Sequence, residues 1–509
     1  MKKMFLLCLL APALWASGQK KVNPTKFANS ISPADLSARL HIVASREMEG
    51  RGTPSPGQEK AASYIESQFR SFGLLPGNNG SFRLRYPIYK DSMTGSTLAV
   101  NGTAFQLYGD FAPVANFNYT ADLQFSEVVF AGYGIVDGAN DDYKDLNVTG
   151  KLVLILDGAP ADFKSNLRGY RSPAGLYAKV LNAQKKGAAA ILILSQEIPH
   201  PEGPDQAPYR LSTYSRAITP EVFTVSAAVA EKIMGEDGRD LLSRMKTAPL
   251  HPKSYMANVD LSYAKTSIEA SACDVLGVLE GTDLKDQYVF VTAHYDHLGK
   301  RDTVIYYGAD DDGSGTVSVL EIAEAFTKAK AAGHGPRRTM VFMTVSGEEK
   351  GLWGSQYYTN HPVFPLDKTT VDLNIDMIGR TDSSRKVGDS LNYVYVVGDD
   401  KLSSDLKVIS EAVNKQYTRL ELDYKFNDPK DPNRIYFRSD HYNFASKGVP
   451  IIFYYDGMLG ADYHKPTDTP DKINYSLMAK RAKLVFYTAW EMANRDDMLK
   501  RDIPLEAPR

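Results

Sequence analysis

The chain carries, at residues 288–297, the sequence Tyr-Val-Phe-Val-Thr-Ala-His-Tyr-Asp-His. Its apolar part has the length of a buried strand, and the polar residues follow where such a strand would leave a sheet. Similar stretches come next: expected strands lie at 339–345, 371–378, 393–397 and 449–455, and expected helices at 316–330 and 476–494. This alternation predicts an α/β fold, a mostly parallel mixed sheet with helices on both faces.

The length and charge of the chain limit the classes of protein to which it can belong. Its 509 residues exceed the size, about 250 to 300 residues, at which a single hydrophobic core stops growing, so we expect at least two domains. The 59 basic and 61 acidic residues give a formal net charge of -2. Such a chain has no broad field to attract nucleic acid or an anionic membrane, so neither is expected as a partner. Function must therefore reside in a local site.

The first residues have the layout of a secretory signal. Lys2 and Lys3 precede an apolar run over residues 4–16, and small residues end it. This run is shorter than the about 20 residues that cross a hydrocarbon core, so we expect no membrane span. The sequence predicts a signal peptide over residues 1–18 and a secreted or periplasmic protein. Cys273, the cysteine that would remain, is most simply a small buried residue.

Acidic and histidine side chains follow the expected strands at five places. These are His294 to His297, the acid run between Gly308 and Gly315, Glu348 with Glu349, Asp376, and Tyr463 with His464. Taken alone, each has an ordinary explanation, such as a hydrogen-bonded loop histidine, a solvated charge or a calcium loop, although the acid run lacks the spacing of a calcium loop. Together they bring imidazoles and carboxylates to the strand ends of one domain, a mixture that suits zinc with open positions for water and substrate.

In this order the five motifs resemble those of the co-catalytic zinc exopeptidases, which include bacterial leucyl-type aminopeptidases and glutamate carboxypeptidases. The resemblance covers residues 288–469. It implies two zinc ions per chain, with Asp311 bridging them, His294 and Asp376 completing one zinc site, and Glu349 and His464 completing the other. It also implies that Glu348 is the general base and that Tyr463 stabilises an oxyanion; the alternative for Tyr463 is a loop side chain that only packs.

Three nearby polar residues have two interpretations each. Asp296 is either a solvated loop charge or a carboxylate that orients a ligand imidazole. Ser439 and Asp440 lie in a segment, residues 438–442, that resembles a substrate-lining loop of the family. Either residue could instead cap a helix.

An earlier segment resembles a protease-associated domain inserted into the catalytic unit. The matching pieces are residues 132–134, 148–151 and 187–190. The resemblance implies a first catalytic part at 19–121, the inserted α/β domain at 122–256, and a second catalytic part at 257–509 with the di-zinc site.

The resemblance implies hydrolysis of peptide bonds in a peptide or protein substrate. An aminopeptidase is the first interpretation, because the surplus carboxylates near the metals favour a free amine. The nearest alternative is a glutamate-type carboxypeptidase. A one-zinc glutaminyl cyclase and a non-enzymatic binding protein on the same fold are disfavoured, because all five proposed ligands and Glu348 are present. Side-chain preference and oligomeric state stay open.

Overall fold

The structure is a computed structural model that describes residues 22–138, 140–167, 172–200, 206–213, 218–239, 241–244 and 252–505. The predicted signal peptide lies outside these residues. The chain divides into two compact units: a main unit, residues 1–86 with 271–509, and an inserted unit, residues 87–270. The predicted insertion at 122–256 falls inside the inserted unit, which begins earlier and ends later because the long strands β2 (Arg83–Val100) and β11 (Lys253–Leu279) each pass from one unit to the other.

The main unit is built on a mixed sheet with the strand order β18-β17-β19-β16-β12-β15-β11. Its strands are β12 (Leu284–His294), β15 (Arg338–Val345), β16 (Thr369–Ile375), β17 (Tyr393–Val397), β18 (Glu421–Asp423) and β19 (Ile451–Tyr455), and the short β1 (Leu75–Pro76) pairs with β11. Strands β19, β16, β12 and β15 are parallel, whereas β17 and β11 run antiparallel to their neighbours β19 and β15. This arrangement confirms the predicted fold class.

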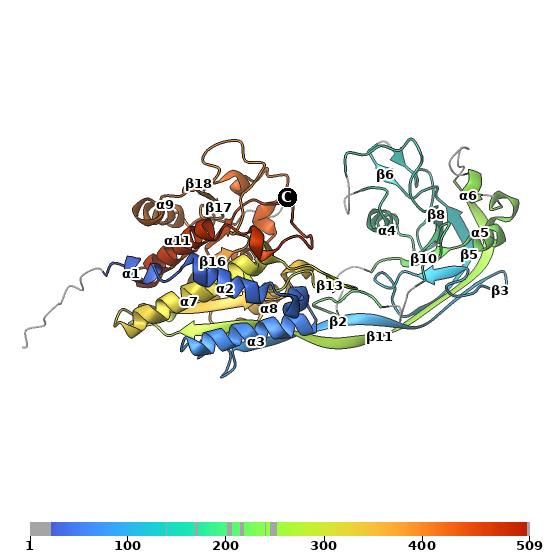
Figure 1. The fold of residues 1–509 in the computed structure, drawn as a ribbon. Coiled ribbons are helices and arrows are strands. Elements are labelled where there is room, and N and C mark those ends of the chain that lie inside the picture. The colour runs from blue at the N-terminus through green and yellow to red at the C-terminus, as the bar shows by residue number, and fades with distance from the viewer. Residues whose placement is uncertain are drawn as a thin grey trace, which may run out of the picture. The chain divides into compact units, whose positions relative to one another are not determined.

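Helices cover both faces of this sheet (Figure 1). They are α1 (Thr25–Ala28), α2 (Pro33–Val43), α3 (Pro56–Ser71), α7 (Gly315–Ala331), α8 (Trp353–Asn360), α9 (Leu406–Tyr417), α10 (His441–Ser446) and α11 (Tyr475–Asn494). Side chains alternate along a strand, so successive residues of β12 enter different cores. Val289 and Val291 pack with α2, α3, α7 and α11, whereas Phe290 packs with Tyr358 of α8 and Phe444 of α10.

The elements expected from the sequence lie close to those observed. The helix expected at 316–330 is α7, and the one expected at 476–494 is α11. Strand β17 has the predicted bounds, while β19 begins two residues later than expected, at Ile451. Pro450 precedes it and has no backbone N–H to donate to a ladder, which explains the later start.

The inserted unit has its own sheet and its own cores. Its parallel strands are β5 (Ala121–Phe130), β8 (Leu152–Leu156), β9 (Ala190–Leu194) and β10 (Glu221–Val225), flanked by the antiparallel β4 (Phe111–Pro113) and by β11. Smaller strands are β3 (Thr103–Ala104), β6 (Val136–Asp137) and β7 (Asn140–Asp141), and the helices are α4 (Leu176–Lys185), α5 (Ala227–Met234) and α6 (Leu241–Arg244). Separate apolar clusters cover the two faces.

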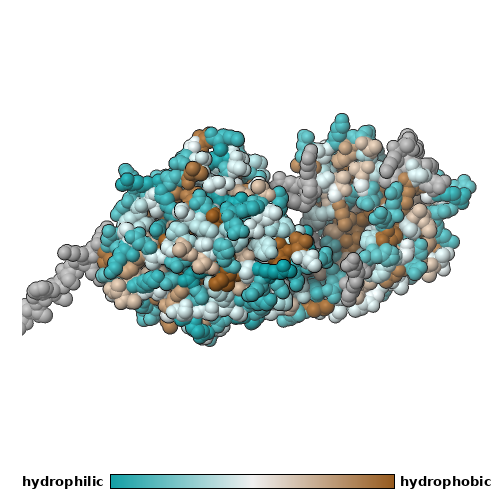
Figure 2. All heavy atoms as spheres, viewed as in Figure 1, coloured by the Kyte–Doolittle hydropathy of each residue, from teal (hydrophilic) through white to brown (hydrophobic). Residues whose placement is uncertain are grey.

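The surface of the main unit in view is mostly hydrophilic, with apolar side chains scattered singly or in small groups (Figure 2). Val387 and Val408 are examples of large apolar side chains that are exposed. Isolated exposed apolar residues are normal for a folded protein. Among the described residues, none of the helices is both long and apolar enough to cross a membrane.

Candidate metal centre

The carboxyl ends of the parallel strands bring the predicted site residues to one edge of the sheet. His294 is the last residue of β12 and pairs with Val345 at the end of β15. Asp376 directly follows β16, which pairs with the other side of β12. Because parallel strands end at the same edge, residues that are far apart in the sequence meet there. His294 Nδ1 lies 3.0 Å from the backbone oxygen of Asp296, which leaves Nε2 free for a ligand.

The three adjacent acids of the loop before α7 have different tasks. Asp312 accepts hydrogen bonds from the backbone N–H groups of His294 and Met377, and so ties the ends of β12 and β16 together. Asp310 accepts one from the N–H of Gly379. Only Asp311 is left to point its carboxylate at the imidazoles.

Two buried residues from distant segments hold this loop in place. The Asp468 carboxylate accepts hydrogen bonds from the N–H groups of both Asp310 and Asp311. The guanidinium of Arg51 donates to the backbone oxygens of Val43, Tyr295, Tyr307 and Gly308. Arg51 is fully buried, and its positive charge lies among the acids Asp296, Asp311, Asp312 and Asp468. The loop is thus held by one side chain from the early part of the sequence and one from its late part.

The predicted ligands form two groups that share Asp311. In the first group, His294 Nε2 lies 3.4 Å from Asp311 Oδ1 and 3.5 Å from Asp376 Oδ1. In the second, His464 Nε2 lies 3.2 Å from Asp311 Oδ2 and 3.1 Å from Glu349 Oε2. A further imidazole, that of His297, also lies beside Asp311 and Glu349. One carboxylate with an oxygen in each group is the arrangement that bridges two metal ions.

The chemistry of these donors fits metal ions. His294 Nε2, Asp311 Oδ2 and Glu349 Oε1 are buried and make no hydrogen bond within the described residues. Burial raises the pKa of Asp311, but the imidazoles of His294, His464 and His297 outweigh burial and hold this pKa well below its usual range. Buried polar atoms are rarely left without a partner. An ionised carboxylate between imidazoles, with unpartnered donor atoms converging, is a site in which a divalent cation would replace the missing partners.

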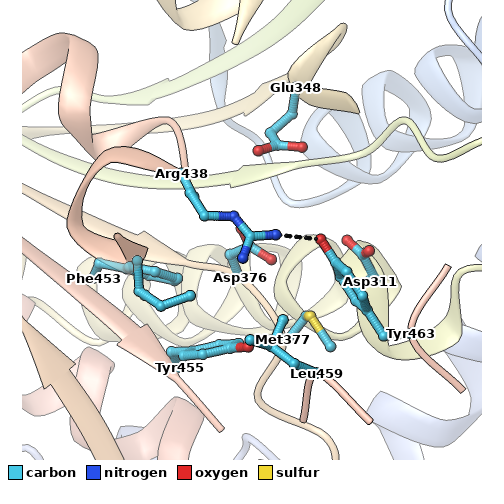
Figure 3. Close-up of a pocket in the computed structure, with 10 residues that line it drawn as sticks. Asp311, Glu348, Asp376, Met377, Arg438, Phe453, Tyr455, Leu459 and Tyr463 are labelled. Atoms are coloured by element: carbon cyan, nitrogen blue, oxygen red, sulfur yellow. Dashed lines mark hydrogen bonds between the residues drawn. The ribbon is translucent and has the colours of Figure 1, made fainter. Parts of the chain in front are cut away.

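Glu348 and Tyr463 line a pocket beside these donors (Figure 3). Burial, and then the negative charges of Glu349 and Asp376, raise the pKa of Glu348 well above its usual value, and the charge of His294 opposes the shift only in part. Its Oε2 lies 3.9 Å from His294 Nε2, so the carboxyl faces the first group without joining it. The pocket also contains Asp311, Asp376, Arg438 and the largely apolar set Met377, Ile435, Phe453, Tyr455 and Leu459.

Three other predicted residues, Asp296, Ser439 and Asp440, are buried and are not among the residues that line the pocket. His294 Nδ1 lies nearer to the backbone oxygen of Asp296 than to the Asp296 carboxylate, which is 3.8 Å away. The carboxylate instead accepts hydrogen bonds from the N–H of Glu348 and the hydroxyl of Thr53. The Ser439 hydroxyl accepts from the Asn374 side chain, and Asp440 accepts from Ser355. Both are buried, and Asp440 precedes α10 without capping it through its side chain. Their role at the substrate stays a prediction.

Sequence reasoning did not single out His297 or Arg438. Arg438 reaches into the pocket and donates a hydrogen bond from Nη2 to the Tyr463 hydroxyl at 2.9 Å (Figure 3). The signal for His297 was present, since a second imidazole follows His294 within the same strand-end motif. Arg438 belongs to the segment 438–442 that resembles a substrate-lining loop, but the direction of its side chain depends on the loop between β18 and α10.

An α/β fold whose strand ends carry two donor groups joined by one carboxylate defines a candidate binuclear metal centre. Residues 274–489 match the model of peptidase family M28, and residues 124–233 match that of the PA domain. The chain is thus similar to peptidase family M28 over residues 274–489 and to the PA domain over residues 124–233. These matches confirm the resemblance seen in the sequence.

Individual proteins are similar to parts or to the whole of this chain. A probable leucine aminopeptidase of Trichophyton verrucosum (strain HKI 0517) is 32% identical over 213 residues, which are 41% of this chain and 55% of that protein. The chain thus spans about half the length of this curated relative. The solved aminopeptidase from Aneurinibacillus sp. strain AM-1 has a TM-score of 0.54 at 19% identity, covering 96% of this chain and 100% of that one. A zinc aminopeptidase from Bacillus subtilis has a TM-score of 0.53 at 20% identity, and the match covers 93% of this chain and 99% of that one.

Proposed function

We propose that this protein is a zinc-dependent metallopeptidase that removes residues from the amino end of peptides and holds two zinc ions per chain. The observation that carries the proposal is the sharing of Asp311 between two donor groups, with Glu348 in the adjoining pocket. The relatives and fold neighbours named as aminopeptidases, one of them a zinc enzyme, support it. His294 and Asp376 would hold one ion, Glu349 and His464 the other, and Asp311 both.

Bound zinc would supply a water of lowered pKa and would polarise the scissile carbonyl. Glu348 is placed to do the proton transfer, because its carboxyl lines the pocket and its pKa is raised by burial and by neighbouring acids. Such a carboxyl takes a proton from the attacking water and passes it to the leaving amine. No nucleophilic serine or cysteine is required.

Tyr463 is placed to stabilise the charge that develops on the carbonyl oxygen. Its hydroxyl oxygen already accepts a hydrogen bond from Arg438, so the phenolic hydrogen is free to point into the pocket. Burial, and then the charge of Asp311, raise the pKa of Tyr463, which keeps the phenol protonated as a donor. Pre-positioned donors of this kind are among the largest contributions to catalysis.

The charges of the pocket favour a free amine over a free carboxylate. Asp311, Glu348 and Asp376 line it, and these acids attract a protonated amine. The apolar set around Phe453 and Tyr455 offers a surface for one side chain of the substrate. Arg438 favours the alternative, a glutamate-type carboxypeptidase, because a guanidinium in the pocket could bind a terminal carboxylate. Its hydrogen bond to Tyr463 gives it a different task.

Peptides blocked at one end test the direction of cleavage. The zinc-loaded protein should cleave aminoacyl anilides and peptides with an amidated carboxyl end. N-acetylated peptides should be poor substrates, because acetylation removes the charge and two of the donors of the amine, at about 1 to 3 kcal/mol for each partner left unpaired. The reverse ranking would identify a carboxypeptidase, and inactivity on every peptide with two zinc ions bound would favour a binding protein.

We further propose that the protein works outside the cytoplasm. The support is the arrangement of basic, apolar and small residues over 1–18. Sequencing the amino terminus of protein recovered from the extracellular or periplasmic fraction tests this, and an intact Met1 there would contradict cleavage of a signal peptide.

A further inference from the structure

The imidazole of His297 lies inside the metal centre, although no ligand role follows for it from the motifs. His297 is fully buried, and its Nδ1 lies 2.8 Å from Glu349 Oε1 and 3.8 Å from Asp311 Oδ2. These three residues offer ligand atoms that all lie within 4.8 Å of one another. His297 therefore stands beside the same two carboxylates as His464.

Nδ1 of His297 and Oε1 of Glu349 are close to each other without the alignment of a hydrogen bond. Nδ1 of His297 and Oε1 of Glu349 both lack a hydrogen-bonding partner in the described part of the chain, despite their separation of 2.8 Å. Nε2 of His297 also has none. Two ligands of one metal ion would lie close to each other in this way without being aligned as donor and acceptor. Asp311 Oδ2, the third atom of the group, is likewise without a partner.

The packing fixes the His297 ring in this place. The ring lies against the Cα of Gly308, where an added Cβ would come within 2.4 Å of His297 Cγ. Gly308 also has a φ of 55°, in the left-handed region that glycine adopts most readily. The backbone of the acid loop thus makes room for the imidazole. By contrast, the His464 side chain is 37% exposed and is carried by a loop, and the two rings are 5.9 Å apart.

We propose that His297 is a fourth side-chain ligand of the second metal position, through Nδ1, together with Asp311, Glu349 and His464. This inference deepens the proposed function, since it rests on metal binding at that centre. The two positions would then differ: the first has one imidazole and two carboxylates, and the second has two imidazoles and two carboxylates. Imidazole nitrogen is a preferred ligand for zinc and cobalt.

The difference predicts the order in which the positions fill. The second position has the additional nitrogen ligand, so it should take the first metal ion. The first position should fill at higher metal concentration. A hydrogen-bonding role for His297, in which it only orients Glu349, predicts no additional imidazole at either metal.

The test begins with the unaltered protein loaded with a single equivalent of Co²⁺. X-ray absorption should show two imidazole ligands on that ion. One imidazole, or none, would overturn the proposal without any variant. Binding of no metal at all would instead contradict the proposed function.

Two variants then separate a ligand from an orienting residue. His297→Ala should weaken binding of one of the two Co²⁺ equivalents by about 100-fold or more and leave the other within about threefold, because loss of even an orienting partner costs about 10- to 100-fold. His297→Gln retains an amide that can donate to Glu349 but cannot replace the imidazole. Affinity restored by Gln would overturn the proposal.

The matched control is His361→Ala, which removes an exposed imidazole that contacts the backbone oxygen and the ring of Tyr357, away from the metal centre. It should bind both equivalents normally. The circular dichroism of each metal-free variant reports whether it is folded. Imidazole added to His297→Ala should recover part of the lost affinity if the cavity is intact, and recovery by imidazole but not by an equal concentration of ammonium supports the proposal.

Discussion

Arg438 Nη2 donates a hydrogen bond to the hydroxyl oxygen of Tyr463 at 2.9 Å. The two side chains come from different loops and meet at the pocket, where the arginine holds the phenol in one orientation. Tyr463→Phe should therefore lower kcat by about 10²- to 10³-fold with little change in KM, as expected for the loss of an oxyanion donor. Steady-state kinetics on an aminoacyl anilide measures this.

The companion variant Arg438→Met should lower kcat less, and it should add little to Tyr463→Phe, because it acts through the same phenol. If the two losses multiply in the double variant, Arg438 has a task that is independent of Tyr463. A large rise in KM for Arg438→Met alone would instead indicate that the guanidinium binds substrate.

Glu348 and Glu349 are neighbours in sequence, yet we expect opposite results from the same substitution. Glu348→Gln should retain both zinc ions and lose about 10²- to 10⁴-fold in kcat, because the side chain transfers protons without being a ligand. Glu349→Gln should bind one zinc ion less. Elemental analysis after dialysis, together with kinetics, tests both, and a Glu348→Gln protein that lacks metal would assign Glu348 as a ligand.

Arg51 predicts a link between stability and metal binding. Arg51→Met removes the donors for four backbone oxygens and leaves the surrounding acids without a buried cation. The expected loss is about 3 to 5 kcal/mol in the free energy of unfolding, with weaker zinc binding. Arg51→Lys should recover little, because an ammonium cannot match the planar arrangement of donors. Urea unfolding measures the effect, with the exposed Arg46→Met as the control.

The inserted unit should lose stability as the pH rises. Burial raises the pKa of Glu221 from 4.5 to about 7, although hydrogen bonds from the N–H of Tyr119 oppose the shift. The folded state therefore keeps this proton while the unfolded state releases it at lower pH. The stabilisation is complete below pH 4.5 and is lost as the pH rises to about 7.

Glu221→Gln should accordingly stabilise strands β9 and β10 at pH 8, on the order of 1 to 3 kcal/mol, and do so much less at pH 5. Hydrogen exchange of these strands at the two pH values makes the comparison. An equal effect at both would show that the ionisation of Glu221 does not change on folding. The matched variant Glu236→Gln, on an exposed turn of the same unit, should have no effect at either pH.

The strand-end positions of the candidate ligands could be predicted because they depend on periodicity. The apolar run before His294 predicts one buried strand, and the run before Asp376 predicts another. In a parallel sheet their carboxyl ends lie at the same edge, independent of the loops that connect them. The proposed bridging role of Asp311 needed the resemblance, since nothing in three consecutive aspartates says which carboxylate turns toward the imidazoles. The structure gives the reason: Asp310 and Asp312 are used by backbone N–H groups.

The remaining features depend on contacts between distant segments. His297 follows the strand end by three residues, where the pleat no longer fixes the direction of a side chain. Its position is set by Gly308 and by Glu349, and no local pattern encodes either contact. The bounds of the inserted unit were likewise hidden, because β2 and β11 continue as single strands through the points at which the units change.

The hydrogen bond between Arg51 and Gly308 spans 257 positions of the sequence, and the whole inserted unit is synthesised between these two residues. A ribosome that has completed Arg51 must still add both the acid loop and His464 before the last donor exists. Closing so long a segment has an entropic cost that later contacts must offset. The candidate metal centre is consequently completed late in translation, and a chain that ends before His464 lacks the last donor, however well its early helices form.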